Sequence, residues 1–533
     1  MQISVPTPCQ LSTLLEKGAL SYDSSHTVTA MASLVAPPSS EEATRAPLDI
    51  VAVVDKSGSM GTGGKMALMQ TTLKMLIDRG GLNATDRFGL VSFDDKVKVE
   101  IPLGAMDSAG KEAAAAVVAK LRPGATTNLS GGLLQGIDLL ATAADATAPA
   151  VDAAAQRTRA VLCFTDGIAN VGIRDTPSLV SAVQGVLKGA PPVSCFTFGF
   201  GADHNEDMLR GVAEATASLY YYIADADSIP AAFADCLGGL VSVVAQNATL
   251  TLQAPPGASA IKRVLGNQRG ATEASLAPEP QSTITLQLGD LYADDEKDVL
   301  LELELPVLNG PAGNATPPPA AAPPAAAEPP AADAPPGAAP DEMEWEHIEA
   351  AAPVVLRASL RYFCVRNSAM VQVESCVSID RPRVTPEGQR IPPKLDQQRN
   401  RLEAAAAMAE AAALADRGEI SSGSARLERA ATYVRKSPSA ASPASVELVR
   451  EMEELRTNYA STECYRSVGS KMSKMSAMCH EQQRSNHVSA AQYDREGSSK
   501  MRMKRMFELK RSLQPQPPQP PQPPQPPQPP GIN

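Results

Sequence analysis

Between residues 47 and 246 the chain alternates short apolar runs with longer amphipathic stretches. The apolar, strand-like runs lie near residues 49–54, 87–93, 160–164, 193–199 and 219–223, and the helix-like stretches lie near residues 65–79, 108–121, 129–143, 176–188, 206–215 and 228–244. Strands that alternate with helices are typical of βαβ units, in which helices cover both faces of a mostly parallel sheet. The pattern therefore predicts an α/β domain with a doubly wound, Rossmann-like sheet over residues 47–246.

A second pattern flanks this domain on both sides. Residues 21–46, 247–309 and 352–392 contain segments in which β-branched and polar residues alternate, separated by turn residues. This alternation predicts an antiparallel β-sandwich. Because its strands lie both before and after residues 47–246, we expect the α/β domain to be inserted in the sandwich. Residues 1–20 remain as an N-terminal segment.

Residues 394–512 favour a helical C-terminal domain. Apolar residues recur there at spacings of three and four, which predicts a helix pair joined through Gly418 to Gly423 and a further helix over 443–465. A solvated helical spacer is the alternative. The basic stretch 500–511, KMRMKRMFELKR, is interpreted as a surface helix, and a membrane-surface or calmodulin-type segment is its alternative.

Two proline-rich segments are not expected to pack into a core. Residues 310–351 combine Pro with Ala and predict a disordered loop that interrupts the sandwich. Residues 513–533 repeat Gln-Pro-Pro, which predicts a disordered tail that favours polyproline II. The tail is interpreted as a passive spacer, and binding to proline-recognising modules is the alternative.

The composition narrows the classes of function. A net charge of −11 argues against non-specific nucleic-acid binding, which needs a basic surface. The 8 cysteines are scattered, so neither a disulfide framework nor a Cys-x-x-Cys zinc site is predicted. No apolar run reaches the roughly 18 residues of a membrane span, and the first residues lack the pattern of a signal peptide. We therefore expect a cytoplasmic protein without a membrane span.

Hydroxyl and carboxylate side chains follow the ends of two predicted strands and lie in one turn. Asp55, Ser57 and Ser59 follow the first run, Thr127 lies in a Gly/Thr-rich turn, and Asp166 follows the third run. In a doubly wound sheet, ligands bind beyond the carboxyl ends of the central strands. Two carboxylates and three hydroxyls suit a hard cation, Mg²⁺ or else Mn²⁺ or Ca²⁺, and leave one coordination position for an external anion. The alternative is that these residues only cap turns and helices.

The segments PLDIVAVVDKSGSM, DRFGLVSF, TNLSGGL, VLCFTDG and FTFGFGADHNEDML occur in this order along the chain. With them, the chain resembles the von Willebrand factor type A family, including an intact metal-ion-dependent adhesion site at Asp55, Ser57, Ser59, Thr127 and Asp166. Through FADCLGGLVSVVAQN and LGDLYADDEKDVLLELELP it is also similar to plant RING-type ubiquitin ligases of the root-waving group and to inter-alpha-trypsin inhibitor heavy chains.

The resemblance implies a non-enzymatic binding module whose ion accepts an Asp or Glu carboxylate from a protein partner. Since the cysteines cannot form a RING, ubiquitin-ligase activity is not expected. A RING-less adaptor that binds ubiquitin-ligase components or their substrates is the alternative, and a secreted matrix protein is a third option. Lys65 ends a Gly-rich stretch similar to a phosphate-binding loop, but Met66 replaces the hydroxyl residue that such a loop requires. The sequence predicts no catalytic site and leaves the oligomeric state open.

Overall fold

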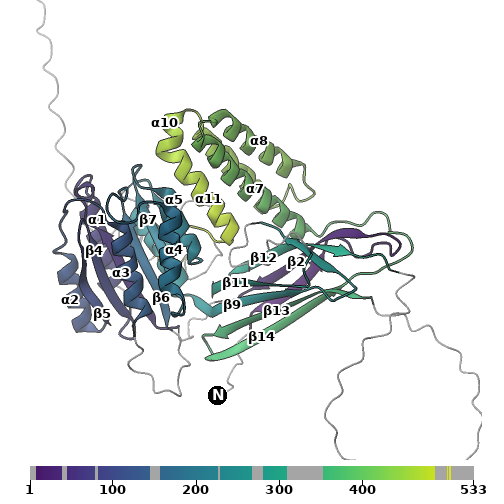
Figure 1. Cartoon of the computed structure of the whole chain (residues 1–533), viewed down its shortest axis with the longest axis horizontal. Helices are drawn as coiled ribbons and strands as arrows, with labels where there is room; N and C mark the ends of the chain where they lie inside the picture. The colour runs from purple at the N-terminus through teal and green to yellow at the C-terminus, as the bar shows by residue number, and fades with distance from the viewer. Residues whose placement is uncertain are drawn as a thin grey trace, which may run out of the picture.

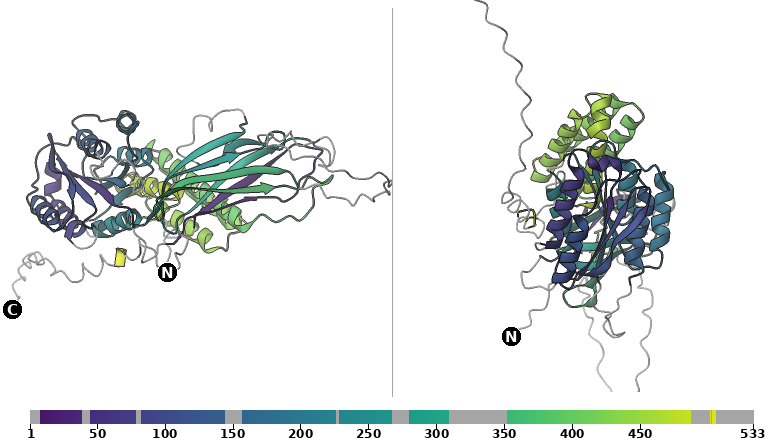
Figure 2. Two further views of the ribbon diagram at one scale, coloured as in Figure 1. Left: turned by 90° about the horizontal axis from the view of Figure 1, so that it is seen from below. Right: turned by 90° about the vertical axis from the view of Figure 1, so that its left-hand side faces the viewer.

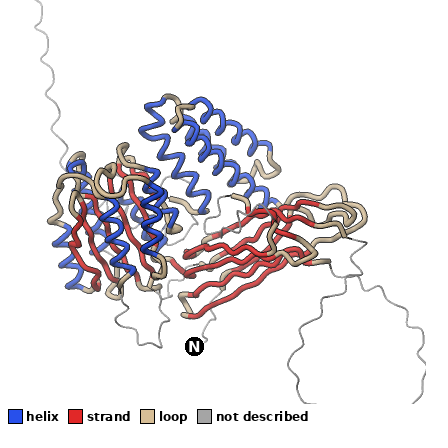
Figure 3. Tube along the Cα trace, in the orientation of Figure 1, coloured by secondary structure: helices blue, strands red, loops and turns tan. Residues whose placement is uncertain are grey.

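The computed structural model describes residues 8–38, 45–78, 82–143, 157–225, 228–266, 280–308, 352–486, 501 and 503–505. These residues form an α/β domain, a pair of antiparallel sheets and a helical region that contacts both (Figures 1 and 3). The loop predicted at 310–351 and the tail predicted at 513–533 lie outside the described residues.

The α/β domain contains a six-stranded sheet in the order β5-β4-β3-β6-β7-β8. Its strands are β3 (Leu48–Asp55), β4 (Arg87–Phe93), β5 (Val97–Ala105), β6 (Thr158–Thr165), β7 (Ser194–Phe200) and β8 (Tyr220–Ile223). Its helices are η1 (Gly58–Gly61), α1 (Lys65–Asp78), α2 (Ser108–Val118), α3 (Leu129–Ala141), α4 (Thr176–Leu187), α5 (Glu206–Ala215) and α6 (Ile229–Leu240). All neighbouring strands are parallel except β4 and β5, and helices cover both faces (Figure 2). The predicted doubly wound, mostly parallel sheet is confirmed.

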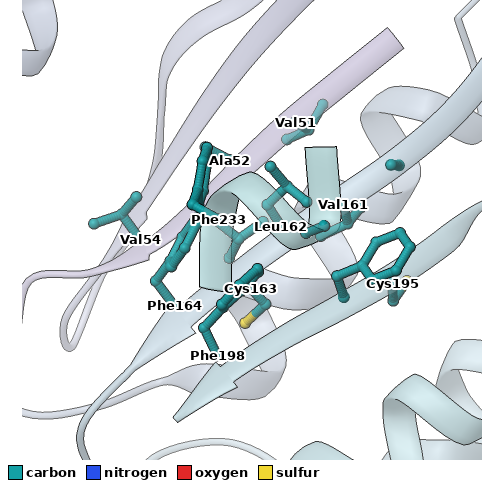
Figure 4. Packing of buried hydrophobic residues seen from close by; sticks show 14 of the residues in the cluster. Val51, Ala52, Val54, Val161, Leu162, Cys163, Phe164, Cys195, Phe198 and Phe233 are labelled. Carbon is teal, nitrogen blue, oxygen red and sulfur yellow. The ribbon is translucent and has the colours of Figure 1, made fainter. Parts of the chain in front are cut away.

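The centre of this sheet is rigidly packed. Every residue of β3 and β6 is buried, as expected for central parallel strands covered on both faces. Phe164 of β6 stacks on Phe198, with ring centroids 4.7 Å apart, and on Phe233 of α6 at 5.5 Å (Figure 4). On the other face α3 approaches closely, because a Cβ on Gly136 would lie only 2.3 Å from the Val53 side chain. The ends of β3 and β6 are therefore fixed relative to each other.

The domain differs from the sequence prediction in one strand and in the end of one helix. Strand β5 was not predicted; it is a half-exposed edge strand whose residues show no continuous apolar run. The helix predicted over 228–244 is too long, since α6 ends at Leu240 and Val243 begins β9. Residues 240–244 are apolar almost throughout, a pattern that fits a buried helix and a buried strand equally well.

The remaining strands form two four-stranded antiparallel sheets, β1-β2-β12-β10 and β11-β9-β13-β14. Their strands are β1 (Gln10–Leu15), β2 (His26–Val35), β9 (Val243–Gln253), β10 (Ala260–Val264), β11 (Thr283–Tyr292), β12 (Glu296–Leu305), β13 (Val354–Cys364) and β14 (Ala369–Ser378). Side chains from both sheets share one hydrophobic core. The chain enters the α/β domain after β2 and leaves it into β9, so the predicted insertion is confirmed. Strand β1 lies within residues 1–20, where no strand was predicted.

The C-terminal region is helical, as predicted. It contains α7 (Pro393–Asp416), α8 (Ile420–Lys436), α9 (Pro443–Thr457), α10 (Thr462–Cys464), the π-helical turn η4 (Tyr465–Gly469) and α11 (Ser470–Gln482). Gly423 does not join the helix pair but lies inside α8, where a Cβ would meet the Ala411 carbonyl oxygen of α7 at 2.7 Å. The helix predicted over 443–465 ends earlier, at Thr457. Among the described helices, none combines the length and the apolar character needed to cross a bilayer.

Helix α11 covers the outer edge of the α/β sheet (Figure 1). The backbone N–H groups of Tyr220 and Tyr222 on edge strand β8 donate to the sulfur atoms of Met478 and Met475, each at 3.3 Å. The Lys474 ammonium reaches carboxylates at the start of α5. A strand edge left open would expose unpaired backbone groups, so α11 completes the domain.

Part of the basic stretch 500–511 also packs on this domain. Met503 is buried in the core of the α/β domain. The Lys504 ammonium lies 3.1 Å from a carboxylate oxygen of Asp235, a fully buried residue of α6. The other Asp235 carboxylate oxygen accepts a hydrogen bond from the Tyr221 hydroxyl. The described part of this stretch therefore contacts the protein itself, as expected for a surface helix.

Candidate metal centre

The candidate ligands lie at the carboxyl ends of the two central strands. Asp55 is the last residue of β3, and Asp166 directly follows β6. Because Val54 pairs with Phe164 in parallel register, the next residues, Asp55 and Thr165, are neighbours. This is the edge of the sheet at which doubly wound proteins bind ligands.

Hydrogen bonds connect four of the five candidate residues. The Ser57 backbone N–H donates to Asp55 Oδ1 at 2.7 Å. The Ser57 and Ser59 hydroxyls lie 3.0 Å apart, and the Ser59 hydroxyl donates to Asp166 Oδ1 at 2.7 Å. The two serines therefore bridge the two carboxylates, as their alternate positions in the turn predicted.

The fifth residue, Thr127, approaches the same point from the loop before α3. A Cβ on Gly167 would lie 3.2 Å from Thr127 Oγ1 and 3.8 Å from Asp55 Oδ2, so both oxygens face this glycine. The Asn170 side chain accepts from the Thr127 N–H at 2.9 Å, and the Thr127 carbonyl accepts from the Asn170 N–H at 3.1 Å. The structure thus brings all five predicted residues together. That they bind an ion remains a prediction.

The loops that carry these residues are tied to one another. The Gly58 N–H donates to the Ala125 carbonyl at 2.9 Å, and the Asn128 N–H donates to the Asp94 carbonyl at 2.7 Å. The Lys56 ammonium lies 2.6 Å from Asp94 Oδ2. The Asn128 side chain also caps the first turn of α3. The side chains are therefore held in place before any ligand arrives.

The centre contains more negative than positive charge. Burial raises the pKa of Asp55, the nearby Asp166 raises it further, and hydrogen bonds from Thr165 and Ser57 oppose the increase. Among the described residues, no basic side chain reaches Asp55. Asp166, whose side chain is also buried, pairs with the Lys65 ammonium at 2.6 Å. One ammonium thus faces two buried carboxylates, and a charge that is buried without a partner is costly.

The donor atoms fit a hard divalent cation. All five side chains present oxygen, the preferred ligand of Mg²⁺, Mn²⁺ and Ca²⁺. Within the described residues there is no cluster of three or more His, Cys, Asp or Glu side chains that would form a metal site of another type. An added cation would also supply the positive charge that the two carboxylates lack.

Two residues of the centre are not among the predicted ligands. Thr165 Oγ1 donates to Asp55 Oδ2 at 2.6 Å and holds the carboxylate in place. Lys65, dismissed as part of a false phosphate loop, contacts Asp166. A lysine is unfavourable at the first position of a helix, because it faces the positive end of the helix dipole. That misfit was the one signal in the sequence that Lys65 has an acidic partner.

Comparison with known proteins relates the α/β domain to a family. The model of the von Willebrand factor type A domain matches residues 49–235. The E3 ubiquitin-protein ligase WAV3 of Arabidopsis thaliana is 28% identical over 270 residues, which are 49% of this chain and 31% of that protein. The inter-alpha-trypsin inhibitor heavy chain H1 of Sus scrofa is 29% identical over 163 residues, 30% of this chain and 17% of that protein. Each match thus spans less than a third of the relative.

The fold is also similar to that of a solved structure. The protein described as von Willebrand factor type A from Catenulispora acidiphila superimposes with a TM-score of 0.59 at 18% sequence identity, covering 85% of this chain and 91% of that one. At this identity the likeness concerns the fold alone. Because it covers most of both chains, the whole arrangement, and not only the α/β domain, has a structural counterpart.

Proposed function

Because residues 49–235 form a von Willebrand factor type A domain, we propose that this chain is a non-enzymatic, metal-dependent protein-binding module. The proposal depends on one observation: two buried carboxylates, which Ser57 and Ser59 connect by hydrogen bonds, face too little positive charge. A magnesium-type ion would be held there by Asp55, Ser57, Ser59, Thr127 and Asp166.

When bound, the ion would supply a Lewis-acidic position for an Asp or Glu carboxylate of a protein partner. The chain's own residues prepare this position. Only two ligands are charged, so the ion would keep its attraction for a further anion. The bonds from Thr165 and Asn170 hold Asp55 and the Thr127 backbone in place before binding. Such preorganisation lowers the entropic cost of association.

Affinity capture from cell extract tests the proposal, performed in parallel with Mg²⁺ and with EDTA. We expect partners that are recovered with Mg²⁺ and lost with EDTA or in Asp166→Ala. Asp107→Ala is the matched control, because Asp107 caps the start of α2, away from the candidate ligands. Its neighbour Met106 contacts the end of the sheet opposite to these ligands. Partners that Asp166→Ala retains in full would contradict the proposal.

A second candidate function is a RING-less adaptor in protein turnover. The observation that favours it is the similarity to the plant E3 ubiquitin-protein ligase over about half of this chain. The same capture separates the two functions, because an adaptor would recover ubiquitin-ligase components or ubiquitin conjugates. Since no Cys-x-x-Cys pair occurs in the sequence, a RING is not expected in this chain, and we propose that any ligase activity in the recovered material comes from the partner.

A further inference from the structure

Lys65 forms an ion pair with Asp166, one of the candidate ligands. It is the first residue of α1, and its Nζ lies 2.6 Å from Asp166 Oδ2. The other oxygen, Asp166 Oδ1, accepts the hydrogen bond from Ser59. Both oxygens of this buried carboxylate therefore already have partners that carry hydrogen. Each oxygen keeps a second lone pair, so these partners impede a cation at Asp166 without blocking it, and the cation binds best when they turn away.

The two partners differ in what turning away requires. The Ser59 hydroxyl is itself a candidate ligand, and rotation of its hydrogen frees a lone pair while the oxygen stays in place. The Lys65 ammonium has no lone pair and carries charge of the same sign as the ion. Its side chain is 25% exposed and ends a flexible four-carbon chain, so it can move into solvent.

We propose that Lys65 is an internal competitor of the metal, which neutralises Asp166 in the ion-free protein and yields that carboxylate to a divalent cation. This inference rests on the proposed metal-dependent function and extends it to regulation. The competition lowers the affinity for the ion, so occupancy, and with it partner binding, follows the free metal concentration. Asp55 has no such competitor among the described residues, because its partners are a hydroxyl and backbone or side-chain groups of Ser57.

The chain provides a matched control for the loss of charge. Lys56 lies next to Asp55 in sequence, and its side chain is 22% exposed, close to the value for Lys65. Its ammonium pairs with Asp94, which is not a candidate ligand, also at 2.6 Å. Lys65→Met and Lys56→Met therefore remove the same charge from the same region, and only Lys65→Met frees a ligand carboxylate.

Isothermal titration calorimetry of the full chain with Mn²⁺ or Mg²⁺ alone tests the inference. Removing the ammonium that repels the ion should tighten binding by about tenfold or more in Lys65→Met, whereas Lys56→Met, which only breaks a contact between two loops of the centre, should not tighten it. Lys65→Arg, which keeps the charge and the shape of a long basic side chain, should retain the weak affinity. Thermal unfolding in EDTA should show Lys65→Met less stable than wild type, and metal should restore its stability.

Three results would overturn the inference, and they are distinguishable. Equal tightening in Lys65→Met and Lys56→Met would show a general field effect. Unchanged or weaker binding in Lys65→Met, with wild type binding normally, would show that Lys65 does not compete. If wild type and every variant fail to bind metal, as Asp166→Ala is expected to fail, the proposed function falls and this inference falls with it.

Discussion

Replacing Asp55 with Asn should make the protein more stable than wild type without metal and less stable than wild type with metal. Burial raises the pKa of Asp55 above the value of 3.8 expected in an unfolded chain. For a carboxyl group shifted upward, the contribution to stability is lost as the pH rises through the folded pKa. At neutral pH without a cation, the ionised side chain is therefore a cost. Asn removes this charge, and Thr165 can accept a hydrogen bond from its amide as well as donate one to a carboxylate.

With metal, wild type should become more stable than Asp55→Asn. A ligand present at 100 times its dissociation constant stabilises the native state by about 2.7 kcal/mol, if it binds only the native state. For a domain of this size, each kcal/mol shifts the melting temperature by about 2–4 °C, so wild type should gain roughly 5–10 °C. Asp55→Asn loses a charged ligand and should gain far less. We therefore expect the variant to melt above wild type in EDTA and below it in saturating Mg²⁺.

Differential scanning calorimetry at neutral pH, with EDTA and with increasing Mg²⁺, measures both effects. Asp107→Asn again serves as the control, because it removes an acidic side chain from the start of α2, away from the centre. If Asp55→Asn and wild type gain equally from Mg²⁺, the ion binds elsewhere. If the variant is less stable than wild type in EDTA, the ionised Asp55 is not a cost in the ion-free protein, and the electrostatic reasoning is wrong.

Two further predictions concern the helices α5 and α3 of the α/β domain. Burial alone would raise the pKa of Glu206, but a hydrogen bond from Ser470 and the charge of Lys474 lower it overall, from 4.5 to about 2. The stability this provides, about 3 kcal/mol at most, is present above pH 4.5 and lost as the pH falls towards 2, and acid unfolding of Glu206→Gln should lack this component. Gly136→Ala should destabilise by about 1–3 kcal/mol in urea unfolding, because its Cβ meets β3 at 2.3 Å. Gly185→Ala in α4, with nothing within 4 Å, should instead be neutral or stabilising.

The sequence was sufficient for the parts of the fold that local pattern controls. The central strands β3 and β6 are continuous apolar runs because both of their faces are buried, and such runs are visible in a sequence. An aspartate lies at the carboxyl end of each, as the last residue of β3 and directly after β6, so the parallel arrangement alone brings Asp55 and Asp166 to one edge. The half-exposed strand β5 lacked this signal and was missed.

Contacts between distant segments could not be predicted in the same way. The apolar residues of α11 indicate a buried helix face, but they do not indicate that Met475 and Met478 accept hydrogen bonds from β8. Likewise, Lys65 and Asp166 are separated by 101 residues, and neither neighbourhood identifies the other as its partner. Pairing of this kind follows from the assembled fold, because a single charged residue is compatible with many partners.

The cover that α11 provides for β8 has a consequence during protein synthesis. Met478 lies 258 residues after Tyr220, whose N–H it accepts. At elongation rates of 5–20 residues per second, roughly 13–50 s pass between the emergence of the strand and that of its helix. Throughout this interval the nascent α/β domain presents a bare strand to other chains and to chaperones. Ribosomes that stop before α11 would release a protein in which this vulnerability is permanent.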